Sequence, residues 1–468
     1  MRYISTRGAA PALDFSDAML AGLARDGGLY VPESWPSVTP GEVEALAGRD
    51  YAEVAFRVTR PFVGGALDED AYRAIVEETY SVFTHEAVAP LKALAPNHWV
   101  MELFHGPTLA FKDYAMQLLG NLFNHVLGER GGRVTIVGAT SGDTGSAAIE
   151  ACRGREAIDI FILFPHGRVS DVQRRQMTTV EAPNVHAIAI DGTFDDCQAL
   201  LKDMFNDPGF RDEVALSGVN SINWARILGQ IVYYFVAAAA LGCWERRIAF
   251  AVPTGNFGNI YAGYVARRMG LPISHLVLAT NANDILSRLL ATGVMKRGEV
   301  HPSLSPSMDI QVASNFERFL FDLMGGDGAR VAQQMAGFQA TGELPLGDDA
   351  LATAREVFAG FRLDDDGTLE EISRCYKATG ELLDPHSAIG VAGGAASRRD
   401  PSIPMVSLAT AHPAKFPEAV ERATGIAPGL PAHLAGLMTR PERFDVLAND
   451  LAAVQGYVRG RLAARAPA

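Results

Sequence analysis

Cysteine is scarce in this sequence of 468 residues, and no CxxC pair occurs. The four cysteines are far apart, at Cys152, Cys197, Cys243 and Cys375. This spacing argues against both a zinc site and a disulfide framework. The longest apolar run, ILGQIVYYFVAAAALGCW, contains Gln230 and is flanked by charges, so a buried helix explains it better than a membrane span. The start of the chain, MRYISTRGAA, lacks the apolar core of a signal peptide, so we expect a reduced, cytoplasmic protein. From the cysteine spacing and the apolar run we expect no metal and no membrane partner.

Positive charge is also in short supply. The chain has 41 Lys and Arg residues against 54 Asp and Glu residues, which gives a net charge of −13. This balance argues against a nucleic acid or an anionic membrane as the main partner. A hydrophobic fraction of 48% with 20% charged residues is typical of an ordinary globular protein. The length exceeds what one hydrophobic core usually serves, so we expect two or three domains or subdomains.

Short β-branched or apolar runs begin near residue 97 and alternate with segments of helical length. The runs are HWVMELF, RVTIVGA, IDIFILF, NVHAIAI, RIAFAVP, ISHLVLAT and IPMVSLAT. Continuous apolar strands that alternate with helices predict a parallel, doubly wound α/β core. We expect a helical N-terminal region over 1–92, the core over 93–427 and a helical extension over 428–468. Within the core, a smaller subdomain is expected at roughly 130–220, and the remainder forms the larger one.

Lys112 stands at an unusual place in FHGPTLAFKDYAMQLLG. Apolar residues at helical spacing predict a helix that begins near Phe111. A lysine in the first turn opposes the helix dipole, at a cost of about 0.3–1 kcal/mol. One interpretation is that the side chain simply reaches out to water. The other is that the charge is placed against local preference because it takes part in chemistry.

Two strand-to-helix loops are candidates for anion binding. In VGATSGDTGSAA (137–148), the hydroxyls of Thr140, Ser141 and Thr144 would point with backbone N–H groups at one place. This loop lacks the GxG of a dinucleotide fingerprint and the lysine of a Walker loop, and a plain helix cap is the alternative. In AVPTGNFGNIYAGY (251–264), closely spaced glycines and asparagines tolerate the backbone of an anion nest. Two such loops suggest that substrate and cofactor both carry anionic groups.

Two further stretches carry polar residues at the edges of apolar elements. In GVNSINWARILGQ (218–230), Asn220, Ser221 and Arg226 lie before or within the first turns of an apolar helix. Such an arginine is either paired structurally or binds an anion bidentately. In LATAHPAKFPEA (408–419), Thr410 ends a predicted strand, where ligands of open α/β sheets usually bind. A simple strand cap is the alternative for Thr410.

Taken together and in this order, these stretches resemble the threonine synthases, pyridoxal phosphate enzymes of the tryptophan-synthase-β fold type, in their longer bacterial and fungal branch. The resemblance extends from YISTRG and GLARDGGLYVPE through LFHGPTLAFKD, GATSGDTGSAA, VNSINWARI, PTGNFGN and LATAHPAKF. Asp143 stands where many fold relatives carry Asn. The resemblance implies two doubly wound parallel-sheet subdomains with a helical N-terminal region.

The resemblance also assigns roles to residues. Lys112 would hold pyridoxal 5′-phosphate covalently, and burial at a helix start would favour its neutral, nucleophilic amine. The implied cofactor-binding residues are Lys112, Gly255, Asn256, Phe257, Gly258, Asn259 and Thr410. Thr140 and Ser141 would receive the substrate carboxylate. The implied residues for a second phosphate, on the substrate, are Thr144, Asn220, Ser221 and Arg226.

The activity that the resemblance implies is a β,γ-replacement on O-phospho-L-homoserine, a carbon–oxygen lyase reaction that ends threonine biosynthesis by giving L-threonine and phosphate. One alternative is a threonine-synthase-like phospholyase that releases 2-oxobutyrate from the same substrate. Another is a serine or threonine dehydratase, against which Arg226 weighs because that reaction needs no second phosphate site. A non-catalytic sensor of a phosphorylated metabolite would not need Lys112. The expected state is a monomer or a homodimer.

Overall fold

The computed structural model describes residues 1–465, which divide into two compact units. Unit 1 consists of Met1–Ala115 and Ser221–Pro428, and unit 2 consists of Met116–Asn220 together with the segment from Gly429 onward. Each unit has its own sheet. Within the described residues, no helix combines the length and the apolar character that crossing a bilayer requires.

The sheet of unit 1 has six strands in the order β13-β10-β9-β14-β4-β3. All neighbouring pairs are parallel except β3 with β4, so the predicted parallel core is confirmed here. Four predicted runs form strands, and the short edge strands β3 and β13 were not predicted because they lack a continuous apolar run. The strands are β3 (Leu91–Ala95), β4 (His98–Glu102), β9 (Ile248–Pro253), β10 (Ile273–Thr280), β13 (Phe358–Arg362) and β14 (Met405–Ala409).

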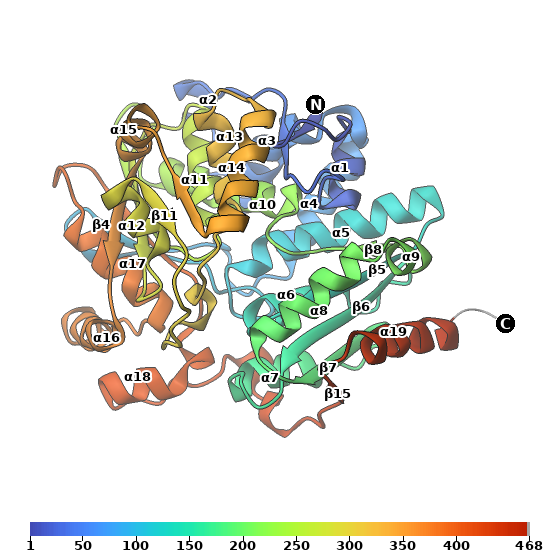
Figure 1. Ribbon diagram of the computed structural model, residues 1–468. Coiled ribbons are helices and arrows are strands. Elements are labelled where there is room, and N and C mark those ends of the chain that lie inside the picture. Colours follow the sequence, from blue (N-terminus) through green and yellow to red (C-terminus); the bar gives the residue numbers. More distant parts are fainter. Residues whose placement is uncertain (466–468) are drawn as a thin grey trace. The chain divides into compact units, whose positions relative to one another are not determined.

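Helices cover both faces of this sheet, which explains why its central strands are apolar throughout. On one face, α17 (Pro385–Ala396) presents glycines, and a Cβ on Gly394 would lie 3.2 Å from the Cβ of Ala251. On the other face, Tyr234 of α10 (Trp224–Ala240) packs on Phe250 with ring centroids 4.8 Å apart. Because residues 250 and 251 are adjacent in β9, their side chains point to opposite faces. The remaining helices of this part of unit 1 appear in Figure 1 and are α11 (Gly258–Arg268), α12 (Ile285–Thr292), α13 (Phe316–Leu323), α14 (Gly328–Thr341), α15 (Asp348–Val357), α16 (Asp365–Thr379) and α18 (Pro417–Thr424).

The N-terminal region of unit 1 is mainly helical, as expected, and each helix start has a side-chain cap. The helices are α1 (Phe15–Ala21), α2 (Pro40–Glu44), α3 (Tyr51–Val63) and α4 (Glu69–Ser81), capped by Asp14, Thr39, Asp50 and Asp68. The region also contains an unpredicted antiparallel pair, β1 (Tyr3–Ser5) with β2 (Tyr30–Pro32). Tyr3 and Phe62 pack against Trp224 at the start of α10, each with ring centroids 5.8 Å apart. A second small antiparallel pair joins β11 (Val294–Lys296) to β12 (Glu343–Pro345).

The sheet of unit 2 has five strands in the order β15-β7-β6-β5-β8, all parallel. They are β5 (Val134–Ala139), β6 (Ile158–Pro165), β7 (Val185–Asp191), β8 (Leu216–Ser217) and β15 (Asp445–Ala448). The segment for which a helical C-terminal extension was expected contains a strand as well as a helix. Its strand β15 pairs with β7 before α19 (Leu451–Arg465) begins. The half-exposed sequence DVLA lacks the apolar run that would predict a strand.

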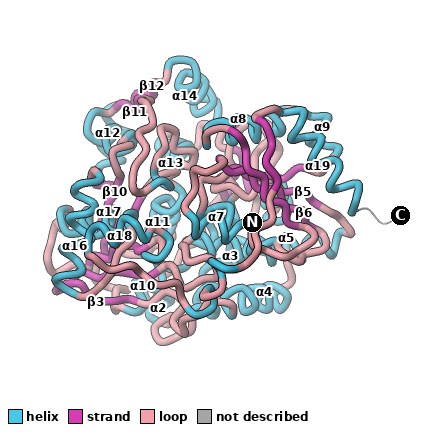
Figure 2. Tube along the Cα trace, turned by 90° about the horizontal axis from the view of Figure 1, so that it is seen from below, coloured by secondary structure: helices cyan, strands magenta, loops and turns pink. Residues whose placement is uncertain are grey.

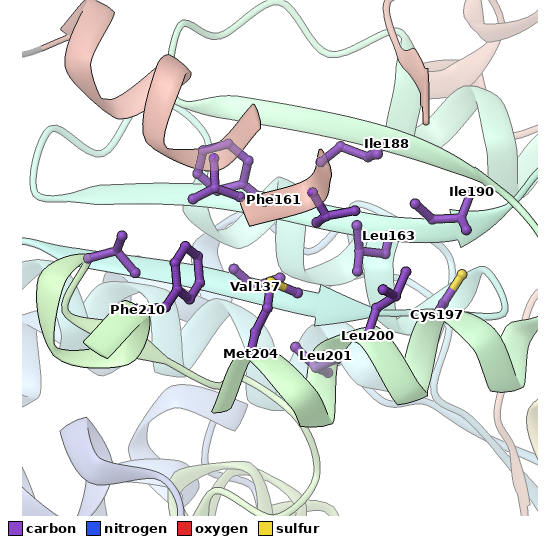
Figure 3. Packing of buried hydrophobic residues seen from close by; sticks show 13 residues of the cluster. Val137, Phe161, Leu163, Ile188, Ile190, Cys197, Leu200, Leu201, Met204 and Phe210 are labelled. Carbon is purple, nitrogen blue, oxygen red and sulfur yellow. The ribbon is translucent and has the colours of Figure 1, made fainter. Parts of the chain in front are cut away.

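The core of unit 2 lies between this sheet and α8 (Phe194–Asn206). Figure 3 shows Val137, Phe161 and Leu163 of the strands facing Leu200 and Met204 of α8. Valines of α19 complete this cluster, and α8 and α19 lie beside β5 and β6 in Figure 2. The other helices of the unit are α6 (Asp143–Cys152), α7 (Asp171–Thr178), α9 (Pro208–Glu213) and the part of α5 (Lys112–Arg130) that follows Ala115.

Candidate functional site

Three adjacent parallel strands of unit 1, β4, β14 and β9, end at the same edge of the sheet. The loops that follow them lead to Lys112, Thr410 and Gly255, which were predicted separately from the sequence. The N–H of Phe111 donates to the carbonyl oxygen of Thr410 at 2.9 Å. The fold therefore brings the residue before Lys112 into direct contact with Thr410, at the edge where ligands of open α/β sheets bind.

Lys112 is the first residue of α5, and its side chain is only 8% exposed. Its Nζ lies 5.0 Å from the centre of the Phe111 ring. The chain that leads to it is fixed, because Leu109 has a left-handed backbone (φ +63°) and its carbonyl oxygen accepts from the N–H of His412 at 3.0 Å. The chain therefore holds Lys112 in a buried position at the start of a helix.

Asp113, which the sequence analysis did not single out, supports the loop before Lys112. Its buried carboxylate accepts from the N–H of Thr108 at 2.8 Å and from the Thr108 hydroxyl. A Cβ on Gly106 would lie 2.5 Å from this side chain, so glycine is needed there. Lys415 donates to the carbonyl oxygen of Thr108 at 2.7 Å. Burial raises the pKa of Asp113 to about 6. The sequence carries no signal for this role beyond the position of Asp113 next to Lys112, because the role depends on burial.

The GNFGN loop (Gly255–Asn259) joins β9 to α11. Phe257 has a left-handed backbone (φ +63°) and precedes the helix, and no side chain caps the helix start. The first N–H groups of any helix lack acceptors within the helix, and here that helix end is buried. A Cβ on Gly255 would lie 2.8 Å from the carbonyl oxygen of Ser307. The loop is therefore closely packed and presents backbone donors, as an anion site requires.

The side chain of Asn259 adds a donor to the GNFGN loop. Its Oδ1 accepts from the hydroxyls of Tyr233 at 2.6 Å and Tyr234 at 3.0 Å. Its Nδ2 is buried and has no hydrogen-bond partner among the described residues. A buried amide donor without an acceptor is costly, about 1–3 kcal/mol, unless a ligand accepts from it. These donors fit a phosphate group.

Arg226 lies in the first turn of α10, close to where α10 crosses α5. A Cβ on Gly229 would lie 2.8 Å from Cα of Ala115, so the two helices are in close contact there. Lys112 lies three residues before Ala115 in α5, and Arg226 lies three residues before Gly229 in α10. Each is therefore within about one helical turn, 5.4 Å along the helix axis, of the contact. Burial lowers the pKa of Arg226 to about 10, which leaves it a cation at neutral pH.

The SINWAR segment (Ser221–Arg226) also borders the GNFGN loop. A Cβ on Gly258 would lie 3.6 Å from Cβ of Ser221. Asn223, which was not predicted, caps α10 through a bond from the N–H of Ala225 and donates to the carbonyl oxygen of Met19 at 2.8 Å. Unit 1 thus brings together Lys112, Thr410, the GNFGN loop, Ser221 and Arg226.

The start of α17 supports two of these segments, a role that the sequence analysis missed. The N–H of Thr410 donates to the Ser387 hydroxyl at 3.0 Å, and that hydroxyl donates to Asp384. Nε2 of His386 accepts from the N–H of Ser307, whose carbonyl oxygen faces Gly255. Asp384, buried at the N-cap, holds both partners.

The TSGDT loop (Thr140–Thr144) and Asn220 lie in unit 2, whereas Lys112 and Arg226 lie in unit 1. Oγ1 of Thr140 accepts from the N–H groups of Gly142 at 2.9 Å and Gly145 at 2.8 Å. Oδ1 of Asp143 accepts from Nε2 of Gln173 at 2.9 Å. A Cβ on Gly142 would overlap the Gln173 side chain. This loop is held by its own side chains, and Ser141 and Thr144 remain partly exposed.

Comparisons with known proteins agree along almost the whole chain. Family models match in three consecutive parts: Threonine synthase N terminus over residues 2–80, Pyridoxal-phosphate dependent enzyme over 82–345, and Threonine synthase, C-terminal over 387–458. The threonine synthase of Pseudomonas aeruginosa is 59% identical over 459 residues, which cover 98% of each chain.

Solved structures show the same similarity. The pyridoxal phosphate-bound threonine synthase from Brucella melitensis has a TM-score of 0.96 and 55% identity, and the match covers 98% of this chain and 99% of that one. Yeast threonine synthase has a TM-score of 0.93 and 37% identity, with 99% of each chain covered.

Proposed function

The chain belongs to the threonine synthase family of pyridoxal phosphate-dependent lyases, and from this premise we propose that its substrate is O-phospho-L-homoserine. Water and this substrate would give L-threonine and phosphate. One feature supports the substrate above the others: the GNFGN loop and the SINWAR segment are neighbours within unit 1. The cofactor needs one phosphate site, and a phosphorylated substrate needs a second.

We propose that the residues predicted from the sequence bind the cofactor, because the groups that they present in the structure suit those roles. The backbone donors of Gly255, Asn256, Phe257, Gly258 and Asn259 would hold the phosphate of the cofactor, and Lys112 would bind it covalently. When bound, pyridoxal phosphate supplies an electron sink for negative charge that develops on substrate carbon atoms. Thr410 would face the ring nitrogen, and a hydroxyl there would leave that nitrogen largely unprotonated, whereas the negative charge of a carboxylate would stabilise the protonated nitrogen.

Lys112 is the residue that we propose for proton transfer. Once the substrate amine has displaced it, its neutral amine would take the proton from Cα. A further proton would leave Cβ and phosphate would leave Cγ. A proton would then add at Cγ, the oxygen of water would add at Cβ, and a proton would return to Cα, which gives L-threonine. Since the side chain is buried and its approach is fixed, Lys112 is positioned to move a proton without exchange with bulk water.

Thr144 and Asn220 of unit 2 stay predictions from the sequence, and we propose that the substrate phosphate is bound in unit 1 by Ser221 and Arg226. The Arg226 guanidinium can form two parallel bonds to phosphate oxygens, and such bonds strengthen as charge builds on the leaving group. Thr140 and Ser141 would receive the substrate carboxylate. We further propose that the protein acts in the cytoplasm, as a monomer or a homodimer.

The experiment that tests this function is incubation of the purified protein with O-phospho-L-homoserine while phosphate, threonine and 2-oxobutyrate are all measured. Equal amounts of phosphate and threonine are expected. Lys112→Ala should abolish both products and the visible absorbance of the lysine-bound cofactor. Release of phosphate with 2-oxobutyrate and no threonine would instead identify a phospholyase, and no turnover at all would reject the substrate.

A further inference from the structure

Asn315, at the start of α13, is connected to the GNFGN loop although it is 56 positions away from Asn259 in the chain. Its side chain is fully buried. Its backbone N–H donates to the carbonyl oxygen of Asn256 at 3.1 Å. A Cβ on Gly258 would lie 3.3 Å from Nδ2 of Asn315. The amide of Asn315 is therefore adjacent to the buried helix start at which we place the cofactor phosphate.

The side chain of Asn315 does not perform the usual task of asparagine at this position. Asparagine is a favoured N-cap because its oxygen accepts from the first turn of the helix. Here no side-chain cap bond is formed. Instead, Oδ1 accepts from Nη1 of Arg318, one turn later. That bond determines which way the amide is turned, with Oδ1 toward Arg318 and Nδ2 on the opposite side. Nδ2 is buried and has no hydrogen-bond partner among the described residues.

Arg318 is itself fully buried, and its bonds are to neutral oxygens. It donates to the carbonyl oxygens of Tyr30 at 3.1 Å and Ile222 at 2.5 Å, besides Oδ1 of Asn315. The neighbouring Glu317 carboxylate is hydrogen-bonded to Arg7 and Thr6 instead. Burial of a cation without a hydrogen-bonded carboxylate is costly. A bound anion close to the guanidinium would reduce that cost.

Asn315 and Asn259 are therefore built alike, although they come from different elements. Each has its amide oxygen occupied by donors, from Arg318 in one case and from Tyr233 and Tyr234 in the other. Each leaves a buried Nδ2 that lacks an acceptor in the described chain. Two such groups at one uncapped helix start point to the same kind of missing acceptor, an anion.

We propose that Nδ2 of Asn315 donates a hydrogen bond to the phosphate of the cofactor and that Arg318 is the positioning residue that orients this amide. The inference rests on the proposed assignment of the GNFGN loop to that phosphate. Arg318 also holds the carbonyl oxygen of Ile222 in the SINWAR segment. A single buried cation is therefore hydrogen-bonded to both Asn315 and the SINWAR segment.

The test compares two ligands that share a ring and an aldehyde. Cofactor is removed from the full-length protein, which is then titrated with pyridoxal phosphate and, separately, with pyridoxal, which lacks the phosphate. The ratio of the dissociation constant of pyridoxal to that of pyridoxal phosphate measures how much the phosphate contributes to binding. A hydrogen bond to a charged group predicts that Asn315→Ala lowers this ratio roughly 10- to 150-fold while pyridoxal binding changes little.

Two further variants keep the proposal testable if Asn315→Ala does not fold. Asn315→Asp has nearly the same shape and keeps an oxygen for Arg318, but it replaces the donor with a negative charge, so it should lower the ratio most. Arg318→Lys keeps the charge but cannot hold Asn315 and the carbonyl oxygens together. It should lower the ratio by less than Asn315→Ala.

Asn283→Ala is the matched control, because Asn283 is a buried asparagine of unit 1 whose Nδ2 donates to the carbonyl oxygen of His301 and to Asp309. It should leave the ratio unchanged. If Asn315→Ala weakens both ligands equally, the residue is only structural and the inference is wrong. If Gly255→Ala lowers the ratio but the Asn315 variants do not, the inference fails while the loop assignment stands. If none of these changes lowers it, the proposed place of the cofactor phosphate is itself wrong.

Discussion

The GNFGN loop and the TSGDT loop have the same layout, a parallel strand followed by a glycine-containing turn and a helix, yet their hydrogen bonds are completed differently. In the TSGDT loop, the hydroxyl oxygen of Thr140 accepts from two N–H groups at the start of α6. In the GNFGN loop, no side chain caps α11, and the buried Nδ2 of Asn259 has no acceptor in the described chain.

This difference indicates how each loop would behave without ligand. A loop whose donors are satisfied by its own threonine keeps its conformation in the absence of a ligand. A loop whose donors are buried without an acceptor is completed only when an anion is bound, so its stability is linked to that anion. This difference is consistent with the proposal that the GNFGN loop binds a resident group, the cofactor, and that the TSGDT loop binds a substrate that comes and goes.

Removal of the cofactor should have the largest effect, because it should destabilise the GNFGN loop but not the TSGDT loop. At a cofactor concentration of 1,000 times the dissociation constant, binding stabilises the folded state by about 4 kcal/mol. Removing it should lower the free energy of unfolding by that amount. In hydrogen exchange, the amides of Gly258, Asn259 and Ile260 should lose protection, whereas those of Gly142 and Gly145 should keep it. Equal loss in both loops would remove the distinction between them.

Arg226→Ala should have the next largest effect, and it tests whether the donors of the GNFGN loop serve the cofactor alone. Loss of a charge-assisted contact that strengthens in the transition state costs about 2–4 kcal/mol, or roughly 30- to 900-fold in kcat/KM. Cofactor absorbance and the binding of an unphosphorylated amino acid should be unchanged. Arg226→Lys should restore only part of the rate, since an ammonium cannot form the two parallel bonds of a guanidinium.

The outcome that contradicts this assignment is loss of cofactor in Arg226→Ala. In that case the SINWAR segment and the GNFGN loop would bind one phosphate between them. Normal turnover of the phosphorylated substrate by this variant would equally reject the proposed second phosphate site.

The strand-loop-helix layout of both loops could be predicted from the sequence, because strand, loop and helix follow one another directly along the chain. The family, the parallel α/β fold and the pyridoxal phosphate cofactor that the motifs implied are confirmed by the matches to known threonine synthases. The contact of Asn315 with the GNFGN loop and that of His386 with Ser307 could not be predicted. They join residues that the fold alone brings together, and no local pattern marks them.

Short strands were missed for a different physical reason. β13 and β15 are partly exposed edge strands, so they need no continuous apolar run and resemble loops in the sequence. The helical start of α5 at Lys112 was predicted correctly because its apolar face has helical periodicity. Asp113 holds the loop before Lys112 through its buried carboxylate, and the sequence alone does not show that this side chain is buried.

Gly255→Ala should have a smaller effect, and it sharpens the comparison from the side of the GNFGN loop. The added Cβ would lie 2.8 Å from the carbonyl oxygen of Ser307, which is backbone and cannot simply rotate away. The loop must shift, at a cost of about 1–3 kcal/mol in cofactor binding. Dialysis followed by absorbance should show a dissociation constant raised roughly 5- to 150-fold. Unchanged retention of cofactor would place its phosphate elsewhere.

Thr140→Val should have the smallest effect and tests the other loop. Valine keeps the shape of threonine but removes the oxygen that accepts from Gly142 and Gly145, so two N–H groups lose their partner. Both bonds are buried, and we expect their loss to lower the free energy of unfolding by about 1–2 kcal/mol, measured in urea without substrate. Thr140→Ser retains the oxygen and should lose less. Cofactor binding should be the same in all three proteins, because the TSGDT loop is completed independently of the cofactor. If Thr140→Val instead leaves stability unchanged and impairs only substrate binding, the hydroxyl does not hold the loop, and the two loops depend on their ligands in the same way.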